Sequence, residues 1–342
     1  MRLVCLVVLV VKSRDVGRVP VILCIDVEPD PRLVSRDAPG PWLGYESTHA
    51  AMASLRPRIE AVSRSAVHFN WFLRMDPQIA EPYGSATWIV DRYRSYLEDV
   101  EQHGDALGVH PHPFRWLAAE QTWLHDYGNQ AWVEECLGMS LESFRRAFGR
   151  PCRLLRFGDH WLNTATVNRA ERLGVECDLT LEPGAAARDT PMPGEPTTGS
   201  FPDYYRVPRA PYVPSETDFR QPRRAPGRTI RMIPLTAGHL RLGARPRAHL
   251  RRLRANGLRH WRQSTPLSMW QRWRAPDAFG AMITRALAAQ RRPYLALAFR
   301  TDTNAEFVAA VDDCLRALLA HPAASRFMFC TPLEALDILA AG

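Results

Sequence analysis

The amino-acid sequence predicts an α/β protein whose parallel strands form a closed or nearly closed barrel. Short apolar segments rich in branched and aromatic residues alternate with helix-like stretches along most of the 342 residues. These segments are continuously apolar, which is typical of parallel strands covered by helices on both faces. Eight such segments can be counted, and eight is the number of strands in a (β/α) barrel.

The expected elements can be placed on the sequence one by one. Gly104, Gly149 and Gly174 each follow a helix-like stretch, as is typical of the residue that ends a helix. The expected strands are 19–25, 67–73, 106–109, 153–157, 175–179, 230–234, 294–299 and 326–330. The expected helices are 49–64, 88–103, 132–148, 164–173, 278–290, 305–320 and 332–339.

We expect residues 19–342 to form a single barrel domain, preceded by a short apolar N-terminal extension at 1–18. A basic insertion at about 183–275 interrupts the alternation of strands and helices. Its first part, 183–228, is rich in Pro, Gly, Arg and Thr and is expected to form long loops over one face of the barrel. Its second part, 240–274, is rich in Arg and Trp. We interpret it as a partly helical, solvated segment whose tryptophans pack on the barrel. A face for an anionic glycan or a membrane surface is the alternative.

Composition restricts the partners and the compartment only loosely. The formal net charge is +8, and Lys12 is the only lysine, so nearly all of the positive charge is arginine. A genome rich in G and C explains this as well as a functional role does, and no nucleic-acid partner is expected. The seven cysteines are odd in number and form no CxxC pair, which favours a reducing compartment over a disulfide framework.

The apolar run at residues 3–11 resembles a short signal peptide. It is too short to span a bilayer, and no small-residue cleavage site precedes the next expected strand. We therefore expect a cytoplasmic protein without stable membrane insertion. Export or membrane attachment is the alternative.

Two carboxylates follow the first expected strand. Asp26 ends it, and Glu28 projects to the same side if the chain stays extended, because side chains alternate along a strand. Pro29 keeps Glu28 extended and stops the strand. Barrel enzymes carry their chemistry at the carboxyl ends of strands. The alternative is that the two carboxylates cap a following loop or helix.

Two histidines follow the third expected strand, in the run Val109-His110-Pro111-His112-Pro113. Proline between them excludes a helix, and an extended backbone puts both imidazoles on one side. This spacing suits a divalent metal with nitrogen ligands.

A third cluster follows the fourth expected strand. Arg156 can orient a carboxylate and keep it ionised. Gly158 permits a close approach or an unusual turn. Asp159 and His160 can reach the same site, and a salt bridge within the loop is an equal alternative.

The order of these clusters resembles the first three motifs of the polysaccharide deacetylase (NodB-homology) family. The pattern is most similar to the subgroup with Asp-Val-Glu in the first motif and His-x-His-Pro in the second. Residues 71–76 resemble the family's second strand, and residues 173–178 resemble the strand after the arginine motif. The resemblance covers most of residues 19–335 and is weakest across 183–275.

The resemblance implies a deformed (β/α) barrel, a zinc-type divalent metal and hydrolysis of an N-acetyl or O-acetyl group. The substrate would be a cell-surface polysaccharide or its precursor. Asp26 matches the family's catalytic base and is also a candidate metal ligand. The family's metal-binding aspartate comes next in sequence, where this chain has Val27, so Glu28 is expected to bind the metal instead.

The resemblance also assigns the remaining site residues. His110 matches the family's first metal histidine. Phe114 stands where the second is usual, so His112 is expected to replace it. The arginine motif maps onto Arg156, and Arg300 stands where the last motif carries an acid histidine. An arginine does not donate its proton usefully, but it can stabilise an oxyanion or hold an anionic group. The residues expected to bind substrate are Arg74, Asp76, Asp159, His160 and Trp161.

Two other functions stay open. The replacement of the acid histidine by Arg300 favours a catalytically silent barrel that binds a glycan or a protein partner. The basic loops favour a metal-dependent hydrolase of another substrate, such as a phosphoester. The sequence does not indicate an oligomeric state.

Overall fold

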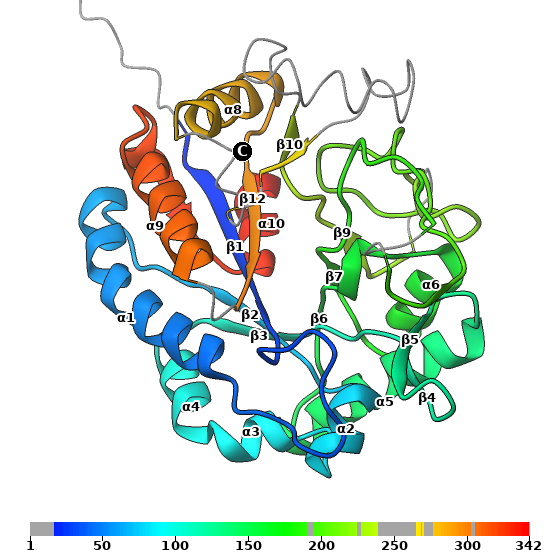
Figure 1. The fold of residues 1–342 in the computed structure, drawn as a ribbon. Helices are drawn as coiled ribbons and strands as arrows, with labels where there is room; N and C mark the ends of the chain where they lie inside the picture. Colours follow the sequence, from blue (N-terminus) through cyan, green and yellow to red (C-terminus); the bar gives the residue numbers. More distant parts are fainter. Residues whose placement is uncertain are drawn as a thin grey trace, which may run out of the picture.

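The protein is built around a mostly parallel sheet that curls into a partial barrel, with helices packed around it (Figure 1). This architecture confirms the predicted fold class. The computed structural model describes residues 17–189, 194–223, 227–238, 265–267, 269, 276–301 and 305–341. The strand order is β12-β1-β2-β3-β6-β7-β9, and β13 also pairs with β1. These strands are β1 (Val19–Val27), β2 (Asn70–Leu73), β3 (Ala106–Val109), β6 (Leu154–Leu155), β7 (Cys177–Asp178), β9 (Arg231–Met232), β12 (Leu295–Arg300) and β13 (Phe327–Phe329).

Strand β1 lies inside the sheet, and all nine of its residues are buried. One edge pairs with β12 and ends at the residue pair Asp26↔Arg300. The other edge pairs with β13 over its first three residues and with β2 over its last four. Because side chains alternate along a strand, Ile22 and Cys24 belong to a core inside the curled sheet, whereas Leu23 belongs to the larger core beneath the helices.

The two ends of the sheet approach each other at Thr236. On one side, Leu235 N–H donates to Leu181 O at 2.8 Å. On the other, Thr236 N–H donates to Ala296 O of β12 at 2.9 Å, and Ala296 N–H donates to Thr236 Oγ1 at 2.9 Å. These bonds link the curled sheet across its opening.

The predicted glycine caps are confirmed. Gly149 follows α5 with a φ of 67°, and its N–H donates to Arg145 O. Gly104 and Gly174 also have positive φ, which costs glycine little. The helices are α1 (Leu43–Ser63), α2 (Pro77–Tyr83), α3 (Trp88–Arg92), α4 (Arg94–Gln102), α5 (Gln130–Phe148), α6 (Thr164–Arg172), α8 (Pro276–Ala289), α9 (Ala305–Leu319) and α10 (Pro332–Ala341).

Several predicted boundaries are wrong. Helix α1 begins at Leu43 rather than at residue 49, because the N–H groups of Leu43 and Gly44 donate to the Asp30 carboxylate, at 2.9 and 2.8 Å. The helix predicted at 88–103 is divided at Tyr93 into α3 and α4. The strands predicted at 153–157, 175–179 and 230–234 shrink to two residues each.

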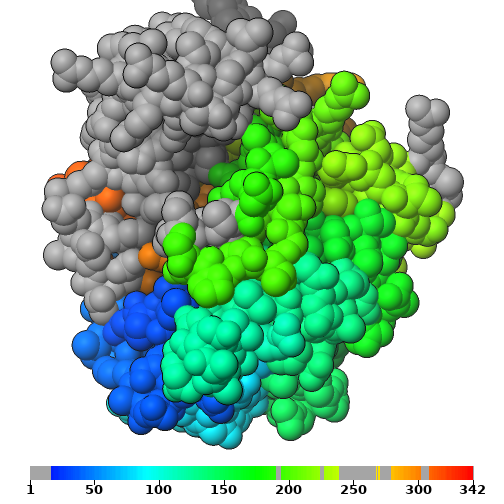
Figure 2. Space-filling model, turned by 45° about the vertical axis from the view of Figure 1, so that its right-hand side comes forward, coloured from blue at the N-terminus to red at the C-terminus, as the bar shows by residue number. Residues whose placement is uncertain are grey.

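A small second sheet was missed by the sequence analysis. Strands β4 (Phe114–Leu117) and β5 (Thr122–Asp126) form an antiparallel hairpin, and β8 (Thr197–Thr198) pairs with β5. The hairpin is anchored by Trp123, whose Nε1–H donates to Val34 O at 2.8 Å. In Figure 2 it lies beside the loop that follows β1 and the segment around β8.

Some predictions fall outside the described residues, namely those for the apolar run 3–11 and for most of the segment 240–274. The six cysteines that the structure describes are buried, and none of them forms a disulfide. None of the described helices is long and apolar enough to cross a membrane.

Candidate metal centre

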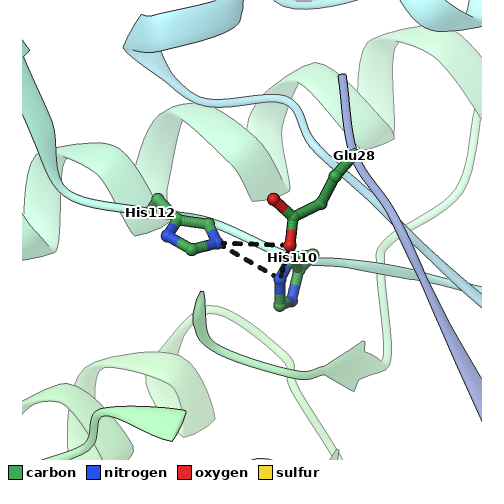
Figure 3. A group of neighbouring side chains, drawn as sticks. All are labelled: Glu28, His110 and His112. Atoms are coloured by element: carbon green, nitrogen blue, oxygen red, sulfur yellow. Dashed lines mark hydrogen bonds and ion pairs between the residues drawn. The ribbon is translucent and has the colours of Figure 1, made fainter. Parts of the chain in front are cut away.

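Glu28, His110 and His112 meet at the carboxyl ends of β1 and β3 (Figure 3). Glu28 Oε1 lies 3.4 Å from His110 Nε2 and 3.9 Å from His112 Nε2, and the two Nε2 atoms are 3.2 Å apart. All three residues are buried. One carboxylate oxygen and two imidazole nitrogens thus face a common point, which is a donor set that suits a zinc-type ion.

The position of Glu28 follows from the way β1 ends. Thr301, the residue after β12, receives a hydrogen bond from Glu28 N–H at 3.0 Å and donates to Glu28 O at 3.0 Å. These two bonds keep Glu28 aligned with β12 beyond the end of β1. Glu28 therefore stays on the same side as Asp26, as the strand alternation predicts.

Backbone hydrogen bonds place the two histidines. His110 N–H donates to Leu73 O at 2.8 Å, which continues the ladder between β2 and β3. After Pro111, His112 N–H donates to Asp76 Oδ2 at 3.1 Å. Asp76 in turn caps helix α2 by accepting from Gln78 N–H.

The ring of His110 is held by a backbone carbonyl. His110 Nδ1 lies 2.6 Å from Arg156 O, and a carbonyl can only accept, so Nδ1 carries the proton. When the ring is neutral, its lone pair is therefore on Nε2 and faces the common point. A second contact of this kind on the far nitrogen is typical of metal-binding histidines. Burial alone would lower the pKa of His110, but the carboxylates of Asp26 and Glu28 raise it.

The ring of His112 is held by packing and charge. It stacks on Phe114 at a centroid distance of 5.1 Å. Gly158 lies so close that a Cβ there would stand 2.4 Å from the imidazole. His112 Nδ1 is 3.4 Å from Asp159 Oδ2, longer than an ordinary hydrogen bond. Because Nδ1 of His112 faces Asp159, its Nε2 is the nitrogen that faces Glu28 and His110.

Asp26 and Arg156 form a buried ion pair beside the three candidate ligands. Arg156 Nε donates to Asp26 Oδ1 at 2.6 Å, and its Nη1 donates to Leu179 O at 2.9 Å. Asp26 Oδ1 also lies 3.7 Å from His110 Nδ1. Asp26 therefore borders the site, but it does not belong to the group of three whose ligand atoms converge.

Arg74 and Asp76 lie beneath the site and are fully buried. Arg74 binds both Asp76 oxygens, at 2.5 and 3.1 Å. Its Nη1 has no hydrogen-bond partner among the described residues and lies 3.6 Å from Glu28 Oε2. Arg74 thus attracts one oxygen of Glu28 while the other, Oε1, faces the histidines.

The surroundings of the site shift the pKa values of His112 and Glu28. Burial, followed by the charge of Arg74, lowers the pKa of His112 to about 4. Burial alone would raise the pKa of Glu28, but its hydrogen bond to His110 and the nearby positive charges lower this pKa well below its usual range. An ionised carboxylate and a neutral imidazole are the forms that bind divalent metals.

Asp159 joins the site to a second polar cluster that the sequence analysis missed. Its carboxylate receives hydrogen bonds from Arg32 Nη2 at 2.7 Å and Tyr127 OH at 2.6 Å, and it lies 3.5 Å from His125 Nδ1. His125 Nε2 is 2.6 Å from Glu195 Oε2. Alternation along the hairpin could have placed His125 and Tyr127 on one face, but nothing in the sequence links Arg32 or Glu195 to them.

Asp159 and His160 both have left-handed backbones, with φ of 54° and 59°. Such strain in residues other than glycine is held in place by surrounding contacts. His160 Nδ1 lies 3.3 Å from Thr180 O, and His160 O accepts from Tyr204 OH at 2.9 Å. Trp161 is buried and donates to Ser200 O. His160 and Trp161 therefore flank the candidate ligands without joining them.

Arg300 is the last residue of β12 and the register partner of Asp26. Ala296 and Ala298, at alternate positions before it, belong to the core inside the curled sheet. Strand alternation thus places Arg300 on the same face as Asp26.

No protein-family model and no curated protein matches the chain. Among solved structures, the chain is similar to a provisionally assigned glycoside hydrolase/deacetylase from Parabacteroides distasonis. The identity is 13%, the match covers 95% of this chain and 71% of that chain, and the TM-score is 0.53. A provisionally assigned polysaccharide deacetylase from Mycobacterium smegmatis matches at 13% identity, over 96% of this chain and 93% of that chain, with a TM-score of 0.48. The first likeness supports the barrel fold and nothing beyond it.

Proposed function

We propose that this protein is a metal-dependent carbohydrate deacetylase that hydrolyses an acetyl group of a cell-surface polysaccharide or its precursor. The observation that carries the proposal is the convergence of Glu28, His110 and His112 beside the Asp26–Arg156 pair. Three protein ligands leave a fourth position open for substrate or water, as in catalytic zinc sites. A divalent ion held there supplies a Lewis acid for an acyl carbonyl.

The remaining steps of the hydrolysis depend on side chains of the protein. Asp26 removes a proton from the attacking water, and Arg156 holds the Asp26 carboxylate in position. Water adds to the acyl carbon, the bond from that carbon to nitrogen (or oxygen) breaks, and acetate leaves. The departing amine takes its proton from protonated Asp26 or from His160. Arg300 stabilises the developing negative charge or holds an anionic group of the substrate.

We assign a supporting role to three residues expected from the sequence to bind substrate. Arg74 and Asp76 are fully buried, so direct contact with a polysaccharide would need a rearrangement. Their contacts with Glu28 and with the His112 backbone favour orientation of the ligands instead. The contact of Asp159 with His112 Nδ1 favours the same role.

A silent barrel that binds a glycan or a protein is the second candidate, because Arg300 stands beside Asp26 where an acid is needed. A phosphoesterase is the third, supported by the excess of arginine. The test uses the full chain loaded with zinc, assayed against acetylated glucosamine oligomers and aryl phosphoesters. Acetate release that disappears in a His110→Ala/His112→Ala variant supports the deacetylase. Metal binding without acetate release would overturn it, and glycan binding or phosphate release would then identify which alternative holds.

We also infer that residues 19–342 form one domain and that the protein is cytoplasmic. The hydrogen bonds between Thr236 and Ala296 support the first point, because they join the two ends of the sheet. The six described cysteines are buried and form no disulfide, which supports a reducing compartment. Cell fractionation that recovers the chain outside the cytoplasm would contradict the location.

A further inference from the structure

A cleft of about 1010 Å³ lies far from the metal centre, at the opposite ends of the strands. Arg153 and Glu176, which line it, directly precede β6 and β7, and Arg231 begins β9. Helix α10 and the loop between α8 and β12 complete its walls. In a parallel sheet all strands begin at one edge, so this cleft and Glu28 are separated by the length of the strands.

The cleft concentrates positive charge that carboxylates do not compensate. Arg209 Nη1 donates to Ala237 O at 2.6 Å, Arg231 Nη1 donates to Arg228 O at 3.3 Å, and Arg292 donates to Leu339 O. A backbone carbonyl orients a guanidinium without neutralising it. These three hydrogen bonds, all between described residues, thus go to backbone carbonyls. Of the described residues that line the cleft, five are arginines and two are acidic, and one of these acids, Glu176, is already paired with Arg153.

The charged groups around Arg209 differ from those around other arginines of the chain. Burial lowers its pKa, and no carboxylate counteracts this. By contrast, nearby carboxylates raise the pKa of Arg32, Arg74 and Arg156. Arg209 is nevertheless exposed to solvent, so an anion that enters the cleft can reach its guanidinium directly. Tyr294 OH lies 3.2 Å from Arg209 O and donates to Pro234 O at 2.6 Å, which places the Arg209 backbone beside the start of β12.

The cleft also has an apolar wall. Leu333, Leu336 and Leu339 of α10 line it, and they are only partly buried although they pack against the core inside the curled sheet. Pro211 and Ala289 extend this wall. A ligand that fills the cleft would therefore contact guanidinium groups at one side and leucine side chains at the other.

We propose that this cleft binds a phosphate-bearing amphiphile, with the phosphate held by Arg209 and Arg231 and the apolar chain lying along α10. A phosphate group carries up to two charges and three acceptor oxygens, so it can engage more than one guanidinium fork. The free amphiphile and a lipid headgroup share this chemistry. The inference is independent of the proposed deacetylase activity, because none of its residues belongs to the metal centre.

The test measures binding of dodecyl phosphate, below its critical micelle concentration, to the full chain by calorimetry. Arg209→Gln/Arg231→Gln is expected to weaken binding about tenfold or more, since hydrogen bonds between charged groups are the strong ones. Leu336→Gln is expected to weaken dodecyl phosphate but not inorganic phosphate. The matched control is Arg58→Gln/Arg172→Gln, which removes two exposed arginines elsewhere on the surface.

Each possible result either supports or overturns the proposal. Equal binding by the wild type, the cleft variant and the control variant overturns the proposal. If inorganic phosphate binds as tightly as dodecyl phosphate, the proposal that the apolar chain lies along α10 is overturned. Sedimentation of the protein with phosphatidic acid vesicles, if it is lost when Arg209 is replaced, supports the proposal and identifies a lipid headgroup as the source of the phosphate. Binding of the monomeric amphiphile without sedimentation supports it with a free ligand. Thermal unfolding of each variant verifies that it is folded.

Discussion

Asp26 and Arg300 are register partners at the carboxyl ends of two adjacent parallel strands. Asp26 also binds Arg156, which follows β6, at 2.6 Å. The bond from Arg156 fixes the orientation of the Asp26 carboxylate. Arg300 adds a cation on the same face, where an incoming substrate would meet it.

Arg300→His is expected to change substrate preference. Histidine can donate a proton to a leaving amine at neutral pH, so turnover on a neutral acetylated glucosamine oligomer should rise. The ratio of kcat/KM for an oligomer bearing a carboxylate to that for the neutral oligomer should fall about tenfold, because a charge-assisted hydrogen bond is lost. Arg172→His on the outer helix α6 is the control. An unchanged ratio with normal metal content would show that Arg300 does not contact substrate.

Arg74→Lys is expected to weaken zinc binding about tenfold or more. Lysine keeps the charge but cannot bind both oxygens of Asp76 while approaching Glu28, so the carboxylate of Glu28 loses its fixed orientation. Competition with a chelating dye measures the affinity without any assay of activity.

Arg56→Lys is the matched control for this variant. Arg56 is also largely buried and also pairs with an aspartate, Asp105, at 2.8 Å, but away from the candidate ligands. Both variants should lose stability, and only Arg74→Lys should lose zinc affinity. Equal zinc affinity in the two would limit Arg74 to a structural role.

Gly158→Ala is expected to displace His112. A Cβ at this position would stand 2.4 Å from the imidazole, so the ring or the loop must move. We expect a loss of about 1–3 kcal/mol in the free energy of unfolding from overpacking, together with weaker cobalt binding seen in the visible spectrum. Gly138→Ala in α5 meets no atom within 4 Å and should leave the spectrum unchanged. A native cobalt spectrum in Gly158→Ala would contradict the close packing described here.

Asp178 makes stability depend on pH. Burial raises its pKa to about 7, whereas an unfolded chain titrates near about 4. Between these values the folded state binds more protons, so the contribution of Asp178 to the free energy of unfolding falls as the pH rises from about 4 to about 7. Asp178→Asn should therefore be more stabilising at pH 8 than at pH 5, by roughly 2 kcal/mol.

Urea unfolding at the two pH values checks this expectation, with exposed Asp313→Asn as the control. The Asn amide can still accept from Thr180 N–H, so the local hydrogen bond is kept. The same pH dependence in the wild type and in Asp178→Asn would show that the carboxyl titrates normally in the folded protein.

The positions of the polar residues that follow β1 and β3 were predictable because they depend on local patterns. An apolar run that stops at Asp26, and a His-Pro-His run that cannot be helical, locate side chains at the carboxyl edge of any parallel sheet. The structure places Glu28, His110 and His112 there together. The glycine caps after α5 and α6 were predictable for the same reason.

Features that depend on distant contacts were not predictable. The start of α1 is set by Asp30, which lies outside the helix. The hairpin of β4 and β5 is fixed by the bond from Trp123 to Val34 O, 89 residues earlier in the chain. Glu195 and Arg32 meet across 163 residues. Periodicity within one segment cannot reveal such pairings, because the conformation of each segment depends on its contact with a segment that is distant in the sequence.

The two hydrogen bonds between Thr301 and Glu28 couple the candidate metal centre to the pairing of β1 with β12. Thr301 N–H also donates to Asp26 O, so the amide protons of Glu28 and Thr301 can exchange with solvent only when β1 and β12 come apart. Opening of the last parallel strand would then release the ion and unfold the barrel in one cooperative event. Slow hydrogen exchange at these two amides, and metal release that coincides with the loss of helical signal, follow from that linkage.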